Sequence, residues 1–285
     1  MKTFLTFLFL LFLFTSLNFS QDFDSTKTVL IELIDETEIV GKIINKDSTS
    51  TTVRSVSGVI SVIPNKQISE IKALKGRVIG NEYYMPDPAD NRLMAMPTGR
   101  PLKSGEVQFN AVELIFPHLI LGVNDFFNIG IGGLPFIAEG GGTFIYYLST
   151  KITPLNQKYA AISLGGAIVG STSTSGIVGV AYAVSTFGTF QHSITVGPFF
   201  AFSSDEVFNR PAFLVGGQTR ISKSATLLTE NLFLFGNESE EFIFFPSLGI
   251  RFSGEKLAAD FGTYAVISKD DFFYPIPWIG LSYKF

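Results

Sequence analysis

The chain offers few residues whose types and spacing could support catalysis or metal binding. Its 285 residues include no Cys and two His, His118 and His192. Disulfides, thiolate nucleophiles and thiolate metal ligands are therefore excluded, and two His are too few for the usual transition-metal sites. Hydrolysis requires a His near a nucleophile and an orienting acid, and no spacing here demonstrates that contact. We predict no catalytic residue, no metal site and no cofactor.

Regularly placed charges are stronger candidates for a functional site. On successive predicted strands of the C-terminal half, four charged residues fall at positions that share one face: Arg220, Glu230, Arg251 and Asp260. If these strands close into a membrane barrel, that face is the lumen, because an Arg facing lipid at mid-depth costs about 2 to 4 kcal/mol. We predict a cross-strand ion-pair ladder that either packs a narrow lumen or lines a pathway for a solute.

Phosphate and nucleic-acid binding are disfavoured. The glycine-rich stretches 130–133 and 140–142 are followed neither by Lys-Ser/Thr nor by a dinucleotide pattern, and no helix follows them. We interpret them as strand positions and a loop tip. The net charge of −4 and pI near 5.3 give no electrostatic attraction to a polyanion, so we expect no nucleic-acid partner.

The N-terminus has the pattern of a secretory signal peptide. Lys2 precedes an apolar run over residues 4–14 that only Thr6 interrupts, and small or polar residues follow up to Gln21. A membrane anchor would need about 20 apolar residues. We predict a signal peptide over 1–20, and the lack of Cys at its end argues against a lipoprotein.

Charge density divides the remainder. Residues 1–104 hold 23 charged residues and the longer stretch 105–285 holds the other 23. Within residues 21–75, five β-branched runs alternate with polar turns, at 28–34, 38–45, 51–56, 59–63 and 68–74. This spacing predicts a small five-stranded β-barrel domain. Residues 33–43, with a turn before Gly41, resemble the opening of an Sm-like or SH3-like barrel.

Residues 76–104 predict an extended linker. They contain Pro86, Pro88, Pro97 and Pro101, together with three Gly. Pro lacks a backbone donor and Gly frees the backbone, so neither favours a regular element.

Residues 105–285 alternate apolar with small or polar side chains, as strands of a spanning barrel do. The segments between turns are about 9 to 12 residues long, which a tilted strand needs to cross the hydrocarbon. A secreted β-sandwich also alternates, but residues 159–204 contain no charge at all, whereas a sandwich usually carries charge on its solvated faces. We predict an all-β chain with a transmembrane antiparallel barrel of about twelve strands, or ten if Phe116-Pro117 is not a tight turn.

The C-terminus carries a more specific pattern. Outer-membrane barrels commonly end in an aromatic residue, after a strand with Gly and alternate aromatics. Gly280, Tyr283 and Phe285 resemble this signal in spacing and position. The resemblance implies recognition by the barrel assembly machinery and a site in the outer membrane, in contact with its lipid, with the N-terminal domain in the periplasm.

Linker and barrel also resemble a family of uncharacterised outer-membrane proteins of bacteroidete-type bacteria. The residues that carry the resemblance lie at 91–93, 97–106, 122–125 and 275–278. The family implies a barrel in a Gram-negative cell envelope and no established activity. Three functions remain open from the sequence: a narrow porin-like channel for small solutes, a non-enzymatic scaffold whose N-terminal domain binds a periplasmic protein, and, least favoured, an enzyme at the barrel rim.

Overall fold

The computed structural model describes residues 27–113, 116–138, 141–173, 176–204, 207–235, 243–268 and 272–285. The predicted signal peptide lies outside these residues. Contacts divide the chain into two compact units, Met1–Leu74 and Lys75–Phe285, which we describe separately. No helix in the described part of the chain is both long and apolar enough to cross a membrane.

The first unit is a five-stranded antiparallel sheet. Its strands are β1 (Val29–Leu33), β2 (Glu38–Lys46), β3 (Ser50–Ser55), β4 (Ile60–Pro64) and β5 (Ile68–Ala73), in the order β4-β3-β2-β1-β5. The five predicted strands are confirmed, but the predicted closure into a small barrel is wrong: no ladder among the described residues joins β4 to β5. The 3₁₀ turn Asn65–Gln67 is the whole connection between the two edges, so they meet at a corner and do not run side by side.

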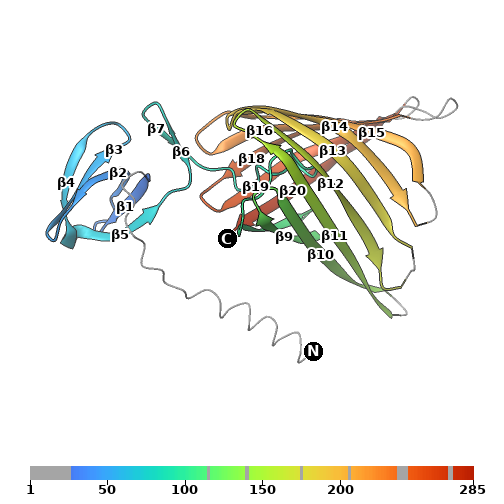
Figure 1. The fold of residues 1–285 in the computed structure, drawn as a ribbon, viewed down its shortest axis with the longest axis horizontal. Helices are drawn as coiled ribbons and strands as arrows, with labels where there is room; N and C mark the ends of the chain where they lie inside the picture. The colour runs from blue at the N-terminus through green and yellow to red at the C-terminus, as the bar shows by residue number, and fades with distance from the viewer. Residues whose placement is uncertain are drawn as a thin grey trace. The chain divides into compact units, whose positions relative to one another are not determined.

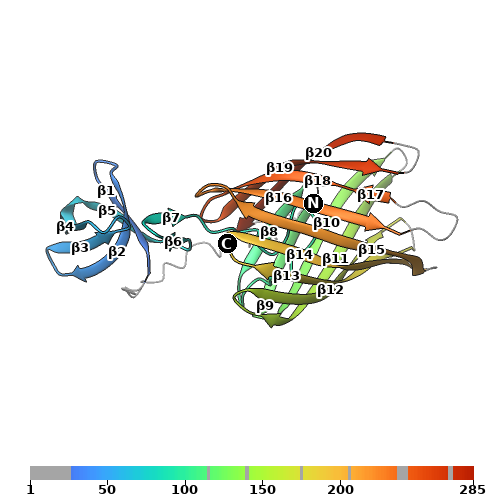
Figure 2. The same ribbon diagram turned by 90° about the horizontal axis from the view of Figure 1, so that it is seen from above.

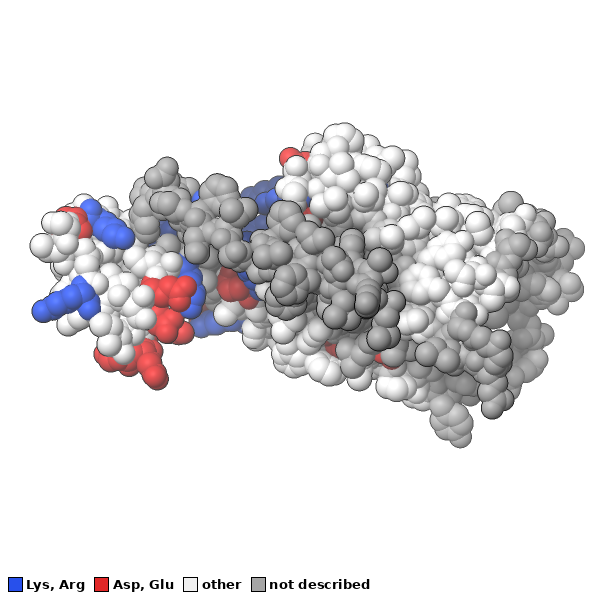
Figure 3. Space-filling model, turned by 90° about the horizontal axis from the view of Figure 1, so that it is seen from below, with Lys and Arg blue, Asp and Glu red and all other residues white. Residues whose placement is uncertain are grey.

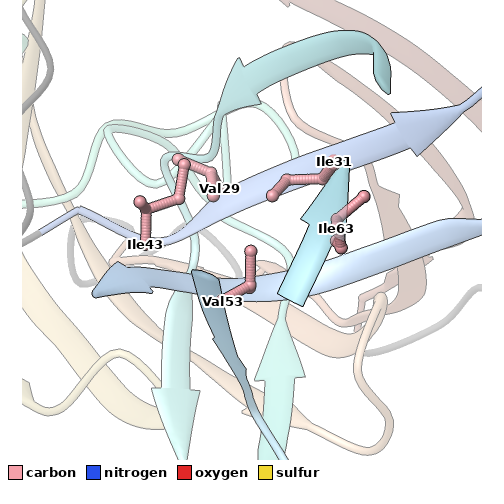
Figure 4. Close-up of a cluster of buried hydrophobic side chains, with 5 residues drawn as sticks. All are labelled: Val29, Ile31, Ile43, Val53 and Ile63. Carbon is pink, nitrogen blue, oxygen red and sulfur yellow. The ribbon is translucent and has the colours of Figure 1, made fainter. Parts of the chain in front are cut away.

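Alternation along the strands builds the core of this sheet. Val29 and Ile31 of β1 point to the same side as Ile43, Val53 and Ile63, and all five are buried (Figure 4). At the β2–β3 turn, Asp47 accepts hydrogen bonds from the Thr49 hydroxyl and from the N–H groups of Thr49 and Ser50. These bonds, the Thr49 hydroxyl first, lower the pKa of the Asp47 carboxyl to about 2, because each of them favours its ionised form.

The second unit contains a closed antiparallel barrel (Figures 1 and 2). Its strands are β8 (Val107–Val112), β9 (Phe116–Asn124), β10 (Phe127–Ala138), β11 (Gly141–Asn156), β12 (Ala160–Ser171), β13 (Val178–Gly188), β14 (His192–Ser203), β15 (Val207–Arg220), β16 (Ala225–Leu234), β17 (Ile243–Phe245), β18 (Ser247–Ser253), β19 (Leu257–Ile267) and β20 (Phe272–Lys284). Pro246 separates β17 from β18, and both pair with β16 and β19, so the two count as one interrupted strand. The barrel therefore has twelve strands, the larger of the two predicted numbers.

The barrel closes where its last strand pairs with its first. Tyr283 of β20 lies opposite Phe109 of β8, and Gly280 lies opposite Val112. The turn predicted at Phe116-Pro117 is wrong, because both residues belong to β9, where they pair with Val112 and Ala111. The chain reverses earlier, where Glu113 adopts a left-handed φ of 50°.

Residues 76–104 do not form the predicted extended linker. Strands β6 (Arg77–Ile79) and β7 (Glu82–Tyr84) pair as a hairpin. The hairpin contacts the barrel's short turns, because the Tyr83 hydroxyl donates to Glu255 and the Met85 N–H donates to the Lys223 carbonyl. Residues 85–104, here called the plug segment, then continue against the inner wall of the barrel. Hydrogen-bonding partners on that wall replace the solvent that a linker would need.

Closure of the barrel can be tested by cross-linking its seam. Ala111 of β8 and Leu281 of β20 are direct partners, and the native chain contains no Cys. Ala111→Cys combined with Leu281→Cys should oxidise to a disulfide that shifts the boiled, non-reduced protein on a gel. Ala111→Cys with Leu227→Cys, on the non-neighbouring strand β16, is the matched control and should not cross-link. Failure of the first pair to react would contradict a closed seam.

Candidate functional site

The outer face of the barrel is an apolar belt. Alternate residues on its strands expose large hydrophobic side chains, among them Leu119, Leu121, Ile129, Ile131, Leu148, Ile152, Leu164, Phe187, Ile194, Phe200, Phe213, Val215, Leu227, Leu248, Phe252, Phe261 and Ile279. On the face seen in Figure 3, the visible barrel wall is largely free of charged residues. A closed barrel with such a belt has the surface of a membrane-spanning barrel, whose strands turn their apolar side chains to lipid.

The inner face holds the plug segment. Ala89, Leu93, Met94 and Leu102 of this segment are fully buried. Glycines of the wall make room for it: a Cβ on Gly216 would lie 2.3 Å from Leu93 Cδ1, and one on Gly262 would lie 2.7 Å from Met94 Cε. The lumen glycines therefore hold a segment of the same chain, and larger side chains at these positions would displace it.

Four buried charges join the plug segment to the wall. Asp260 of β19 accepts from Arg251 Nε of β18 at 2.6 Å and from Arg92 Nη1 of the plug segment at 2.6 Å. Arg251 Nη1 also contacts Asp87 Oδ2 of the plug segment at 3.1 Å. The four charges form a series that alternates in sign, from Arg92 through Asp260 and Arg251 to Asp87, with the two wall residues in the middle. Each buried charge therefore has an opposite charge beside it, which offsets its desolvation.

The predicted ladder of four wall charges is present only in part. Arg251 and Asp260 contact each other, as their positions on the same face of two adjacent strands suggest. Glu230 instead accepts from the Ala95 and Met96 N–H groups of the plug segment, at 3.0 and 2.9 Å, and from the Tyr264 hydroxyl at 2.6 Å. Arg220 lies apart, with its guanidinium 4.2 Å from the centre of the Phe190 ring. Three of the four therefore bind the plug segment or each other, and the fourth sits beside a turn.

Further wall residues that the sequence did not single out fix the backbone of the plug segment. Lys151 Nζ donates to the carbonyls of Asn91, Thr98 and Arg100 at 3.2, 3.3 and 2.6 Å. Asn128 pairs with both backbone groups of Leu102. Lys151 was detectable in principle, as a charge at inward parity. Nothing in the sequence indicated that its partners would be carbonyls of residues expected to form a linker.

Gly99 marks a close approach of the plug segment to the wall. Its N–H donates to Thr186 Oγ1 at 2.8 Å, and its carbonyl accepts from Ser163 Oγ at 2.9 Å. A Cβ at this position would lie 2.3 Å from the Ala161 carbonyl oxygen. Only Gly fits between these strands, and its two backbone groups are both satisfied there.

Beside the plug segment, the lumen contains a cavity of about 240 Å³. Its floor includes Asn91, Arg92 and Met96 of the plug segment, and its wall includes His118, Ser149 and Tyr182. Along β11 it extends from Lys151 to Ser149, and along β13 from Tyr182 to Val180, so it runs from the plug segment toward the loop end of the strands. The plug segment closes the lumen on the short-turn side of this space.

The cavity brings together one His and one Ser that are far apart in the sequence. His118 Nε2 lies 3.0 Å from Ser149 Oγ, a contact that residue spacing did not indicate. Within the described residues no carboxylate is hydrogen-bonded to His118, so the pair lacks the orienting acid of a hydrolytic triad. His192 lies at the start of β14, beside a short turn. It is therefore on a different strand from His118 of β9 and Ser149 of β11. In the described part of the chain no three His, Asp or Glu form a candidate metal group.

The three residues of the C-terminal signal lie at the seam. Gly280 is buried facing the lumen, where a Cβ would lie 3.3 Å from Asp260 Oδ2. The rings of Tyr283 and Phe285 pack edge to face with centres 5.0 Å apart. Their recognition by the barrel assembly machinery stays a prediction.

Removing Asp260 should test the charge cluster. Asp260→Ala leaves Arg92 and Arg251 buried side by side with a single remaining anion, and we expect a loss of about 3 to 5 kcal/mol of unfolding free energy. Lys223→Ala breaks the exposed pair with Glu82 and should cost less than about 1 kcal/mol. Urea titration of the folded form in detergent micelles measures both. Equal effects of the two substitutions would show that the cluster does not hold the plug segment.

No family model and no curated protein matches the chain. Its fold is similar to solved outer-membrane proteins. The KdgM porin is 9% identical, with a TM-score of 0.44 over 63% of this chain and 98% of the porin. A loop-deletion mutant of OmpT, an outer membrane protein of Vibrio cholerae, is 13% identical, with a TM-score of 0.37 over 91% and 96% of the two chains. OpdQ of Pseudomonas aeruginosa is 11% identical, with a TM-score of 0.35 over 91% and 78%. Likenesses this distant carry no argument about function, so the chain's own geometry must supply it: an outer-membrane-type β-barrel closed by its own plug segment.

Proposed function

We propose that the protein is a non-enzymatic membrane anchor, in which a closed outer-membrane barrel presents the β1–β5 sheet to a protein partner in the periplasm. The observation that carries the proposal is the plug segment, which fills the short-turn half of the lumen. The Arg92 side chain and the backbone groups of this segment are hydrogen-bonded to side chains from β10, β11, β12, β13, β16, β18, β19 and β20.

Displacing the plug segment would be costly. Displacement would break the Arg92–Asp260 and Arg251–Asp87 contacts at the same time, and water entering the lumen would have to replace both. Moving the segment would expose Arg251 and Asp260 of the wall and leave Glu230 and Lys151 without their backbone partners. A barrel held shut in this way is better suited to anchoring than to constant conduction.

The β1–β5 sheet offers a surface for a partner. Among the described residues, edge strand β4 pairs with β3 alone, which leaves its other side without ladder hydrogen bonds in that part of the chain. Ile60 and Val62 of β4 are exposed by 56% and 67%. An open edge with exposed apolar side chains supports binding of an extended segment of another protein as an added strand.

The chain path supports a periplasmic position for the β1–β5 sheet. The plug segment enters at the short turns, next to Glu255 and Lys223. In bacterial outer-membrane barrels, short turns face the periplasm and long loops face the exterior. We therefore place the β1–β5 sheet in the periplasm, and the lipid-facing belt in the outer membrane.

A narrow pathway for small solutes is the second candidate, and the lumen cavity is the observation that favours it. The pathway would require the plug segment to leave the short-turn half of the lumen. The two candidates predict different conductance, because only a displaced plug segment leaves water continuous through the barrel.

Conductance in planar bilayers tests the closed state. The native protein should show no channel events at any voltage, whereas deletion of residues 87–101 should produce them, because that stretch fills the lumen. Asp35→Asn in the β1–β2 turn, where Asp35 accepts from the Thr37 N–H outside the barrel, is the matched control and should stay closed. Steady conductance of the native protein would reject the anchor and favour the pathway.

Affinity capture with the full chain tests the anchor. Val62→Lys places a charge on the exposed edge of β4 and should reduce recovery of a periplasmic partner at least about tenfold, which is about 1.4 kcal/mol. Ser57→Lys, on the β3–β4 turn, changes charge equally without touching the edge and should leave recovery unchanged. Equal recovery with the two variants would place the partner elsewhere.

A further inference from the structure

We propose that the partner of the β1–β5 sheet adds an extended acidic segment to edge strand β4, in which Asp or Glu alternates with apolar residues. The proposal rests on the proposed function, because it assigns a chemical character to the partner of the same edge. Three features of the sheet support it: the direction of the free backbone groups of β4, a row of cations that leads to them, and apolar side chains along the edge.

The backbone groups that β4 turns to its open side belong to Ile60 and Val62. At the two ends of the strand, the Val59 carbonyl and the Asn65 N–H form hydrogen bonds of 2.8 and 2.9 Å with the β3 side of the hairpin. Backbone groups alternate in direction along an antiparallel ladder, and the β3–β4 register runs without a shift. The N–H and carbonyl groups of Ile60 and Val62 therefore point away from β3, where an added strand can bond them.

A row of two cations leads to this edge on the side of the sheet opposite its buried core. Lys42 of β2 is the direct partner of Arg54 of β3, and Arg54 is the direct partner of Ile60 of β4. Both cations are exposed, and neither forms an ion pair with another residue in the described part of the chain. Like charges directly opposite each other on two strands repel, so a carboxylate beside them would relieve the repulsion.

Charges elsewhere on this side of the sheet are already paired. Lys72 of β5 contacts Glu32 Oε2 at 3.2 Å and Glu70 Oε2 at 2.9 Å. Residues 50–67, by contrast, hold β3 and β4 and contain Arg54 and Lys66 but no Asp or Glu. The β4 edge therefore attracts an acidic segment and repels the same edge of a second copy, which disfavours pairing of the protein with itself.

The spacing of the strands sets the pattern of the segment. Adjacent strands lie about 4.8 Å apart, so a residue opposite Ile60 on an added strand lies about 10 Å from Arg54, a distance that a Glu and an Arg side chain span together. Ile60 and Val62 cover the space between with apolar surface, at 56% and 67% exposure. The intervening residues of the segment face the side of Ile63, which belongs to the buried cluster of Figure 4, so apolar types suit them.

Peptides that differ only in charge test the segment. Three labelled nine-residue peptides alternate Val with Glu, with Ser or with Lys, and fluorescence anisotropy measures their binding to the full chain in non-ionic detergent at low salt. Protein-free micelles give the blank. The Glu peptide should bind about tenfold more tightly than the Ser peptide, which is about 1.4 kcal/mol, and the Lys peptide should bind more weakly than both.

Removing the cations tests the origin of that preference. Lys42→Gln combined with Arg54→Gln should reduce the Glu-to-Ser affinity ratio to about one, while unchanged binding of the Ser peptide shows that the sheet is still folded. Lys27→Gln combined with Lys72→Gln removes two cations away from the β4 edge and is the matched control, in which the ratio should stay near ten.

Substitutions at Val62 separate strand addition from simple charge attraction. Because its N–H points away from β3, Val62→Pro removes a donor of the open edge and no hydrogen bond of the sheet. This variant should weaken binding of the Glu and Ser peptides at least about tenfold. Val62→Thr keeps the N–H and should bind both peptides like the native chain.

The outcomes distinguish this proposal from the proposed function. Equal affinity of the native chain for the Glu and Ser peptides would overturn the acidic segment and leave the β4 edge as a binding site. Undiminished binding of the Glu peptide to Val62→Pro would overturn strand addition. No binding of any peptide would overturn the proposal together with the edge that the anchor is proposed to present. If Val62→Pro does not fold, the native ratio and the Lys42 and Arg54 variant still decide.

Discussion

Asp260 accepts hydrogen bonds from two guanidinium groups, one on the neighbouring barrel strand and one on a segment that entered the lumen 168 positions earlier in the chain. These two contacts link the barrel wall to the plug segment, the two parts of the second unit. Without Arg92, the Asp260 carboxylate would have Arg251 as its one guanidinium partner. Without Asp87, Arg251 would lose the second of its two carboxylate partners. Because a buried charge needs an opposite charge or several hydrogen-bond partners, the wall charges depend on the plug segment, and the plug segment depends on the wall.

Phe and Gly, the two most unusual residue types of the sequence, have different roles on the two faces of the barrel. Phe200, Phe252 and Phe261 add to the lipid-facing belt, where large apolar side chains need no partner. Gly216, Gly249 and Gly262 face inward and leave space for Leu93 and Met94. The composition of the chain is thus the composition of a barrel that is apolar outside and filled inside by its own backbone.

Period-two alternation was enough to predict the strands of both units and the inward direction of Arg251 and Asp260, whereas the number of barrel strands came from counting turns and was left as twelve or ten. These features depend on neighbours along one strand or on the next strand. The plug segment could not be predicted in this way, since Pro86, Pro88, Pro97 and Pro101 are typical of a linker and its partners lie on strands far along the chain. The open edge of the β1–β5 sheet was missed for a similar reason. Closure depends on how β4 and β5 diverge after the short turn between them, and the pattern of residue types along the chain does not show this.

The position of Ser282 has a consequence for how the molecule is made. Its hydroxyl accepts from Arg92 and donates to Asn110 Oδ1, so one side chain on the last strand contacts both the plug segment and the first strand. The seam between the last strand and the first strand is therefore joined to residues 85–104 through this side chain. A chain whose plug segment was left outside would have to bring β20 to β8 around unpaired charges. One hydroxyl thus takes part both in the seam of the wall and in the packing of the interior, so the place where the barrel closes is also a place where the plug segment is held.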